Sequence, residues 1–276
     1  MWRWSVGKDM KLSVVIPAHN EPELRATVEA LTDRLLAEKI DHEVLIVNDH
    51  STDDTENVSI DLSSRFPSVR YLNNPDPPGF GLAVRYGLEN FKGDAVAVYM
   101  ADASDLPEDL ALFFRKMSAE EVDCVFGSRF LEGSRLLNYP LPKLILNRIA
   151  NHVIRLLFGL RYNDITNAFK LYRRNVIDGV KPILSHHFNL TVELPLKAII
   201  RGYRYAILPN SWINRKTGQS KWKIQEMGSR YLFIVLYCFI EKCLSRGDYH
   251  SSRIANGEKT LSHLQHRGRC FLEAAR

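Results

Sequence analysis

Two aspartates lie three positions apart at the end of a predicted buried strand. Ala95–Met100 is apolar on both faces of its pleat, which is typical of a covered strand, and Asp102 and Asp105 follow it. Ligands of open α/β sheets collect beyond the carboxyl ends of such strands, and carboxylates suit Mg²⁺ or Mn²⁺. The pair predicts a site for a divalent cation or a cationic group. As an alternative, Asp105 caps a helix that begins near Pro107.

Polar residues also follow three other predicted strands. Pro17 closes the first strand, so Ala18–Glu21 must turn over the edge of the sheet, where its groups can meet a ligand. Asp49 follows the second strand, with a turn-forming or helix-capping role as the alternative, and Asp53 is placed as such a cap. Arg129 follows a later strand, and a guanidinium at the mouth of a sheet is a natural phosphate clamp.

Predicted strands and helices alternate along the first half of the chain. The predicted strands are Leu12–Ile16, Glu43–Val47, Val69–Leu72, Ala95–Met100 and Val122–Gly127, with a late strand over Tyr203–Leu208. The predicted helices include Glu21–Lys39, Gly79–Phe91 and Pro107–Lys116. This order predicts an α/β fold with a mostly parallel, doubly wound sheet, flanked by helices and joined by right-handed crossovers.

Two amphipathic segments follow in the second half of the chain. Pro140–Leu160 carries an apolar stripe, with Arg148, Asn151 and Arg155 on the opposite face. That basic face is either a solvated helix surface or a surface that meets anionic lipid. Arg230–Arg246 has an apolar, aromatic-rich body with basic flanks, and it is either a core-packing helix or one that lies on a bilayer.

The length of 276 residues suffices for one sizeable core with an appended segment. We expect one domain over residues 1–225, an amphipathic helix over residues 226–250 and a flexible basic tail over residues 251–276. The longest apolar run near the C-terminus, Tyr231–Ile240, has half of the ~20 residues that a spanning helix needs. No secretory signal is visible at the N-terminus, so we expect no membrane span.

Charge and cysteine content restrict the class of protein further. The net charge is +5, and +3 of it lies between His250 and Arg276, so nucleic acid is not an expected partner. The four cysteines form neither a C-x-x-C pair nor a dense framework, which predicts reduced thiols and a cytoplasmic protein. No dinucleotide-binding or P-loop glycine motif is present.

Four blocks resemble, in order, the signature of family 2 glycosyltransferases. They are Val14–Glu21, Val47–Asp53, Gly127–Arg129 and Asp164–Arg173. Within that family the sequence is most similar to the dolichol-phosphate mannosyltransferase-like, polyprenyl-phosphate branch. The resemblance runs from Leu12 to Lys221, and four ordered blocks are far more specific than one. It implies a Rossmann-like GT-A fold, a nucleotide-sugar donor and a divalent metal ion, Mg²⁺ or Mn²⁺.

The resemblance also assigns residues to the donor. It places the nucleoside at the turn formed by Pro17, Ala18, Asn20 and Glu21, and it lets Asp49 read the base.

In the family, the acidic centre is usually Asp-x-Asp, and it holds the metal against the donor diphosphate. When Met100 is aligned with the residue before that motif, the family positions fall on Ala101 and Ala103, with Asp102 and Asp105 beside them. We take Asp102 as a catalytic, donor-binding residue and both aspartates as metal ligands. The displaced spacing leaves a catalytically weakened nucleotide-sugar-binding protein as an alternative.

The resemblance further implies basic residues around the phosphates. It places Arg129 at the lipid phosphate as a catalytic residue, and Arg148 joins it, although Asn147 stands where the family commonly has serine. Arg215 and Lys221 lie in a segment similar to the family's Arg-x-x-Gly-x-Ser-Lys loop, which closes over a diphosphate. A solvated basic loop is the alternative for that segment.

The implied reaction is inverting transfer of a sugar from a GDP- or UDP-sugar to an acceptor oxygen. A sugar hydroxyl needs a general base, whereas a lipid phosphate is already anionic. The sequence offers phosphate clamps but no convincing base, since Glu193 is equally suited to structural pairing. A polyprenyl or dolichyl phosphate is therefore the expected acceptor, with peripheral contact at the cytoplasmic membrane face. A saccharide hydroxyl is the alternative.

Overall fold

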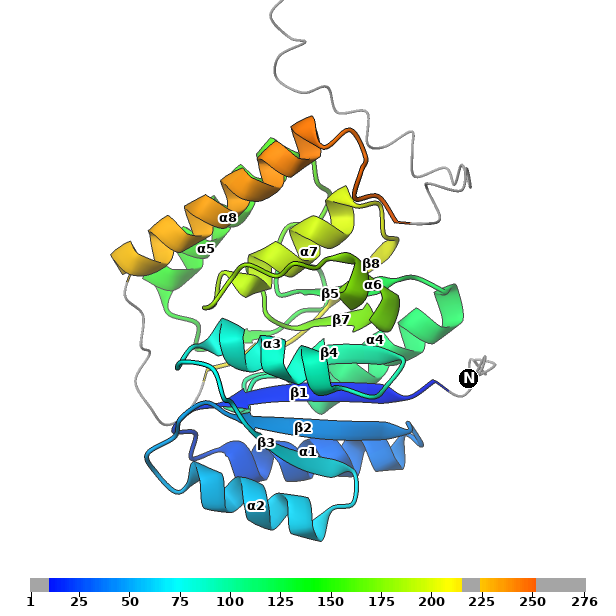
Figure 1. Cartoon of the computed structure of the whole chain (residues 1–276), viewed down its shortest axis with the longest axis vertical. Coiled ribbons are helices and arrows are strands. Elements are labelled where there is room, and N and C mark those ends of the chain that lie inside the picture. The colour runs from blue at the N-terminus through cyan, green and yellow to red at the C-terminus, as the bar shows by residue number, and fades with distance from the viewer. Residues whose placement is uncertain (1–9, 215–223, 252–276) are drawn as a thin grey trace, which may run out of the picture.

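A seven-stranded sheet forms the centre of the protein in a computed structural model that describes residues 10–214 and 224–251 (Figure 1). Its strands are, in spatial order, β3 (Val69–Asn73), β2 (His42–Asn48), β1 (Leu12–Ala18), β4 (Ala95–Val98), β7 (Lys170–Arg173), β5 (Cys124–Ser128) and β8 (Tyr205–Pro209). Only β7 is antiparallel to its neighbours, β4 and β5. The predicted mostly parallel sheet is confirmed.

Helices cover both faces of this sheet. One face is covered by α1 (Leu24–Ala37), α2 (Thr55–Arg65) and α4 (Pro107–Glu120), and the other by α3 (Phe80–Asn90), α6 (Arg174–Gly179) and α7 (Leu190–Ile200). Successive residues of β1 serve different cores, because side chains alternate along a strand: Val14 packs with the α1 side and Val15 with the α3 side. The doubly wound arrangement is therefore confirmed.

Two long helices, α5 (Leu141–Phe158) and α8 (Ile224–Leu244), lie side by side at one end of the molecule, beyond α7 (Figure 1). Their C-terminal parts meet where the rings of Phe158 and Phe239 lie 6.0 Å apart and Lys242 donates to the Phe158 carbonyl oxygen. No helix in the described part of the chain is long and apolar enough to span a bilayer.

The strand order places a crevice where ligands are expected. Strand β1 lies between β2 and β4. The connection after β1 therefore leads to a strand on one side of β1, and the connection after β3 leads to a strand on its other side. Such a reversal separates the loops that follow β1 and β4, and open α/β sheets bind ligands in the gap between them.

Pro17 lies inside β1, so the prediction that it ends the strand is wrong. The strand pairs with β2 as far as Ala18, but with β4 only as far as Val15. The Val15 carbonyl oxygen accepts from the Tyr99 amide, which shows that Val15 faces β4. Pro17 faces the same side two residues later, beyond the last β1–β4 pair, so its missing N–H costs no ladder bond.

Several short elements were not predicted. They are β7, α6 and a two-stranded ribbon of β6 (Leu136–Leu137) and β9 (Trp212–Ile213). In β7 a buried lysine, Lys170, interrupts the apolar pattern that identifies strands. Its ammonium group donates to the carbonyl oxygens of Ile165, Asn167 and Thr191, which satisfies it inside the protein.

Glu43 is a buried carboxylate on β2 that joins neighbouring elements. It accepts hydrogen bonds from Ser13 Oγ (2.7 Å), Arg70 Nη1 (2.9 Å) and the Lys92 amide. Burial opposes its ionisation, but these hydrogen bonds outweigh that effect and lower the pKa of Glu43. The charged form is therefore the one that stabilises the fold.

We expect Glu43→Gln to lower the free energy of unfolding by about 1–3 kcal/mol near neutral pH, because it weakens this buried network. The folded-state pKa lies below the unfolded-state value, so the advantage of the wild type exists above about pH 4 and is lost as pH falls through the folded-state pKa. Urea unfolding across this range measures it. Glu29→Gln, in a partly exposed pair with Arg65, is the control, with an effect below about 1 kcal/mol. An equal loss at all pH values would contradict the assignment.

Candidate active site

A cleft of about 1000 Å³ opens beyond the carboxyl ends of β1, β2 and β4. It brings together eight of the residues predicted for the site, namely Pro17, Ala18, Asn20, Glu21, Asp49, Asp102, Asp105 and Arg129. Two other predicted residues, Arg215 and Lys221, lie outside the described residues.

The two aspartates of the cleft are both buried, with exposed fractions of 6% for Asp102 and 4% for Asp105. The Ser104 amide donates to Asp102 Oδ1 (3.2 Å) in a turn where Ala103 adopts a left-handed conformation, with φ of 55°. No described residue forms a hydrogen bond with Asp105 Oδ2. Burial and the nearby charge of Asp102 raise the pKa of Asp105 to about 7.

The helix-capping alternative for Asp105 is wrong. Helix α4 begins at Pro107, its N-cap residue is Leu106, and no side chain forms a capping hydrogen bond there. Instead, the Asp105 backbone forms a bridge to Trp212, which leaves its carboxylate at the cleft.

These residues fit a divalent cation that is shared with a bound phosphate. The two buried carboxylates are close enough for the charge of Asp102 to raise the pKa of Asp105, so a cation bound by both would be favourable. Asp105 Oδ2, which has no hydrogen-bond partner among the described residues, is an oxygen ligand of the kind that Mg²⁺ and Mn²⁺ prefer. Within residues 10–214 and 224–251, no group of three or more His, Cys, Asp or Glu side chains could hold a metal ion. A bound diphosphate would supply further oxygen ligands to a cation held by these two carboxylates.

The loops after β1 and β2 are tied to each other. Asn20 adopts a left-handed conformation, and its Oδ1 accepts from the Thr52 amide (2.8 Å). The Glu21 amide donates to Thr55 Oγ1 (2.9 Å). Asp53 accepts from the Thr55 amide in a turn, but the N-cap residue of α2 is Asp54 and no side chain forms a capping hydrogen bond there, so the prediction that Asp53 caps the helix is wrong. The backbone of the first loop is therefore fixed where it lines the cleft.

Asp49 holds the loop that leads into α3. Its carboxylate accepts from Asn74 Nδ2 (2.9 Å) and from the Gly79 amide (3.0 Å to Oδ2), while it also lines the cleft. The turn-forming role is thus present, and recognition of a base remains a prediction. His19, which we did not predict, also lines the cleft and hydrogen-bonds the Asp49 carbonyl oxygen through Nδ1 (2.6 Å).

Arg129 enters the cleft as half of a buried ion pair. Its Nε and Nη2 donate to the two oxygens of Asp164 at 2.8 and 2.7 Å, which is a bidentate arrangement. Burial opposes the charge, but Asp164 outweighs it and raises the pKa of Arg129. Two positions earlier, a side chain at Gly127 would lie 2.7 Å from Asn210 Oδ1, so only glycine fits there.

The helix α5 contributes different residues from those predicted. Arg148 is exposed and does not line the cleft; its guanidinium lies 4.7 Å from the Phe130 ring. Lys143 and Asn147 line the cleft instead, and the sequence analysis did not select them for the site. Their spacing of four residues on one helix was the available signal, but only the docking of α5 shows that this side faces the site.

Asn151 corrects the prediction of a solvated basic face on α5. It is buried, its Nδ2 donates to Thr166 Oγ1 (2.9 Å), and its Oδ1 accepts from the Thr166 amide. The inner side of α5 therefore includes one polar residue, which joins the helix to the loop of the Arg129–Asp164 pair. The other two residues of the predicted face, Arg148 and Arg155, are exposed.

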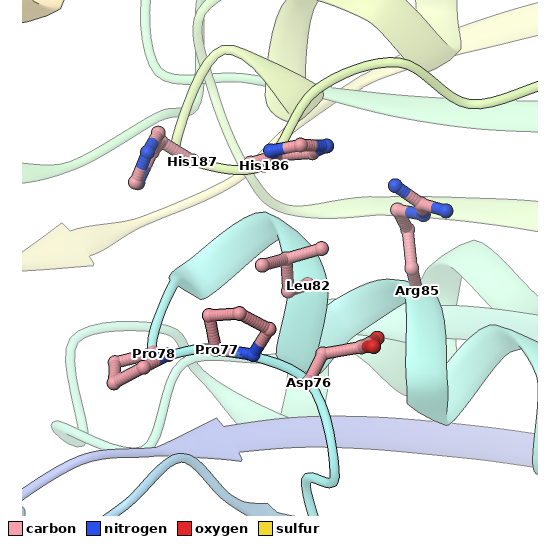
Figure 2. Close-up of a pocket in the computed structure, with 7 residues that line it drawn as sticks. All are labelled: Asp76, Pro77, Pro78, Leu82, Arg85, His186 and His187. Atoms are coloured by element: carbon pink, nitrogen blue, oxygen red, sulfur yellow. The ribbon is translucent and has the colours of Figure 1, made fainter.

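A second cavity of about 420 Å³ lies at the start of α3 (Figure 2). Figure 2 shows Pro77 and Pro78 on the loop before α3, with His186 and His187 facing α3 from the loop before α7. The His186 carbonyl oxygen accepts from the Gly81 amide (3.0 Å), which attaches that loop to the helix. This cavity holds none of the predicted site residues.

Comparison with known proteins places the chain in a family. Residues 13–180 match the model described as Glycosyl transferase family 2. This chain is a family 2 glycosyltransferase. The glycosyltransferase is 29% identical to the polyprenol monophosphomannose synthase of Mycolicibacterium smegmatis, over 75% of this chain and 79% of that protein. It is also 29% identical to the undecaprenyl-phosphate mannosyltransferase of Micrococcus luteus, over 77% of this chain and 87% of that protein.

Solved structures confirm the predicted GT-A fold. The glycosyltransferase superimposes on the glucosyl-3-phosphoglycerate synthase of Mycobacterium tuberculosis with a TM-score of 0.64 and 17% identity, over 85% of this chain and 80% of that one. Another structure of that synthase, in complex with Mn²⁺, UDP and phosphoglyceric acid, gives a TM-score of 0.63.

Asp105→Asn should stabilise the protein when no divalent cation is present. The raised pKa means that the folded state holds the Asp105 proton more tightly than the unfolded state, so charging this group costs stability as pH rises from about 4 through about 7. We expect a gain of about 1–3 kcal/mol near pH 8 that fades as the pH falls toward 4, measured by urea unfolding.

Asp123→Asn is the matched control, since this buried carboxylate accepts from the Arg204 amide (2.8 Å) and should gain nothing. If Asp105→Asn stabilised the protein equally at high and low pH, the charge on the buried Asp105 would not be the cause.

Proposed function

We propose that this glycosyltransferase moves a sugar from a nucleoside diphosphate sugar to a polyprenyl phosphate, with inversion at the sugar. The observation that carries the proposal is the composition of the cleft. Its lining includes the acidic Asp102 and Asp105, the basic Arg129, and apolar residues of α5 and α8 such as Val153 and Val235. A site for both a diphosphate and a lipid phosphate needs both the charged and the apolar residues. The printed activities of the two 29% identical relatives support this acceptor class.

The donor lies beside the two aspartates in this proposal. Asp102 and Asp105 would hold Mg²⁺ or Mn²⁺, and the charge of that ion would stabilise the departing diphosphate. The turn from Pro17 to Glu21 and the carboxylate of Asp49 contact the nucleoside. The geometry suits GDP- and UDP-sugars alike, so the donor base is left to experiment.

The acceptor phosphate approaches from the other side of the sugar. Its oxygen forms the new bond to the anomeric carbon as the bond to the diphosphate breaks, and it needs no proton acceptor because it is already anionic. Arg129 and Lys143 would hold it by charge-assisted hydrogen bonds. Glu193 is unsuited as a base, since it is fully buried and accepts from Lys197 Nζ (2.6 Å) and from two backbone amides.

The structure of the acid turn also favours an active enzyme over the weakened binding protein. Asp105 keeps an unpartnered buried oxygen whose charge is unfavourable, which a purely structural residue would not need. A cytoplasmic protein in peripheral contact with the membrane completes the proposal.

Turnover tests the proposal directly. With polyprenyl phosphate and a panel of GDP- and UDP-sugars, we expect release of the nucleoside diphosphate that requires Mg²⁺ or Mn²⁺. Release should stop when the cation is chelated, because nothing then offsets the repulsion between the two aspartates and the diphosphate. Formation of the glycolipid is followed by mass spectrometry. Tight donor binding without turnover would favour the binding protein, and transfer to saccharides alone would favour a hydroxyl acceptor.

Asp102→Asn should lower kcat by about 100-fold or more while the circular dichroism spectrum stays unchanged, because the variant loses a charge at the metal and diphosphate. Asp53→Asn is the matched control: this exposed aspartate does not line the cleft, and asparagine keeps the oxygen that accepts from Thr55. Near-normal kinetics in Asp102→Asn would refute its role as metal ligand.

A further inference from the structure

The outer sides of α5 and α8 together form an apolar surface, which we call the α5–α8 face. Of the seventeen large hydrophobic residues that are exposed in the described chain, eleven belong to it, whereas the others are scattered. Its members are Leu141, Ile145, Leu146, Ile149, Val153, Leu156, Leu232, Phe233, Leu236, Ile240 and Leu244. A patch of this size on two adjacent helices marks an interaction surface.

The apolar residues of the α5–α8 face are distinct from those with which the two helices pack against the protein. Each helix also has a buried side, formed by Asn151, Ile154 and Phe158 in α5 and by Ile234 and Cys238 in α8. The stripe predicted on α5 is thus the exposed side, with Leu141 at 69% and Ile149 at 55% exposure. In α8, one side packs into the core, as one alternative predicted, and the other side is exposed and apolar.

The charges around the face suit an anionic surface. Arg148, Arg155 and Arg246 are exposed on or just after the two helices. Helix α5 contains no carboxylate, and in the described side chains of α8, residues 228–244, Glu241 is buried against Arg201 (2.7 Å). A cationic rim around an apolar body is typical of helices that lie in the interface of a bilayer.

The face is continuous with the apolar end of the cleft. Leu146, Val153 and Leu232 belong to the face and also line the cleft. Tyr231 beside them donates to the Phe188 carbonyl oxygen (3.1 Å), which joins α8 to the cleft wall. A lipid whose phosphate reached Arg129 would leave the cleft at this edge.

We propose that the α5–α8 face docks in the headgroup and acyl boundary of an anionic bilayer, so that the apolar end of the cleft opens onto the membrane. The prenyl chain of the acceptor then enters between α5 and α8 while its phosphate stays in the cleft. The docking itself stands on the face, and the entry of the chain rests on the proposed acceptor. A second copy of the chain is the competing occupant.

Binding to vesicles of phosphatidylglycerol and phosphatidylethanolamine tests the docking. The full chain should sediment with the vesicles, and the double variant Ile149→Glu, Phe233→Glu should lose about tenfold or more of that partitioning, because two charges enter the apolar boundary. Neither residue lines the cleft. The matched control is Leu36→Glu, Leu112→Glu, with similar exposures of 59% and 55% on α1 and α4, and it should bind like the wild type.

Unchanged partitioning of the Ile149→Glu, Phe233→Glu protein would overturn the proposal. So would a wild type that is dimeric by light scattering, does not bind vesicles and becomes monomeric in this variant, because the face would then be a contact between copies.

Transfer assays separate this inference from the proposed function. With a long-chain polyprenyl phosphate in vesicles, the same variant should lose transfer about tenfold or more, whereas transfer to a short, water-soluble prenyl phosphate should be unchanged. Equal loss with both acceptors would refute a membrane role for the face. No transfer by the wild type to either acceptor would refute the proposed function but leave the vesicle result standing.

Discussion

The rest of one side of the cleft depends on the buried ion pair between Arg129 and Asp164. It joins the end of β5 to the loop before β7, and it has the bidentate geometry that offsets the cost of burying two charges. Thr166 in that loop is held by Asn151 of α5, and Lys170 donates to the carbonyl oxygens of Ile165 and Asn167 in the same loop and of Thr191 in α7. The position of α5, and with it Lys143 and the outer face, therefore depends on this pair.

The part of the cleft around Asp102 and Asp105 differs from the Arg129–Asp164 pair, because it brings two charges of the same sign together. Arg129 is paired with Asp164, whereas Asp105 keeps a buried oxygen that no described residue satisfies, beside a second carboxylate. Such an arrangement costs stability in the free protein and is typical of sites that await a ligand. The two parts of the cleft thus differ: Arg129 is held by internal pairing, whereas Asp105 carries a charge that is unfavourable without a ligand.

The cleft connects these polar parts to an apolar surface. Helices α5 and α8 each bury one side against the protein and expose apolar residues on the other. In an ordinary surface helix, the exposed side would be polar. In α5 the inner side includes the polar Asn151, while the outer side carries Ile145, Ile149 and Leu156. This inversion makes sense if the outer solvent of these helices is lipid rather than water.

The sequence alone determined the alternation of strands and helices, the family resemblance, and the acids and arginine at strand ends, because these depend on local periodicity and on residues adjacent in the chain. The tertiary structure decided the rest. It showed that β7 inserts antiparallel with a buried lysine, that Pro17 faces an unpaired side of β1, and that Asp105 is no helix cap. It also decided which side of α5 faces outward, because a periodic pattern identifies residues that share a face but not what that face meets.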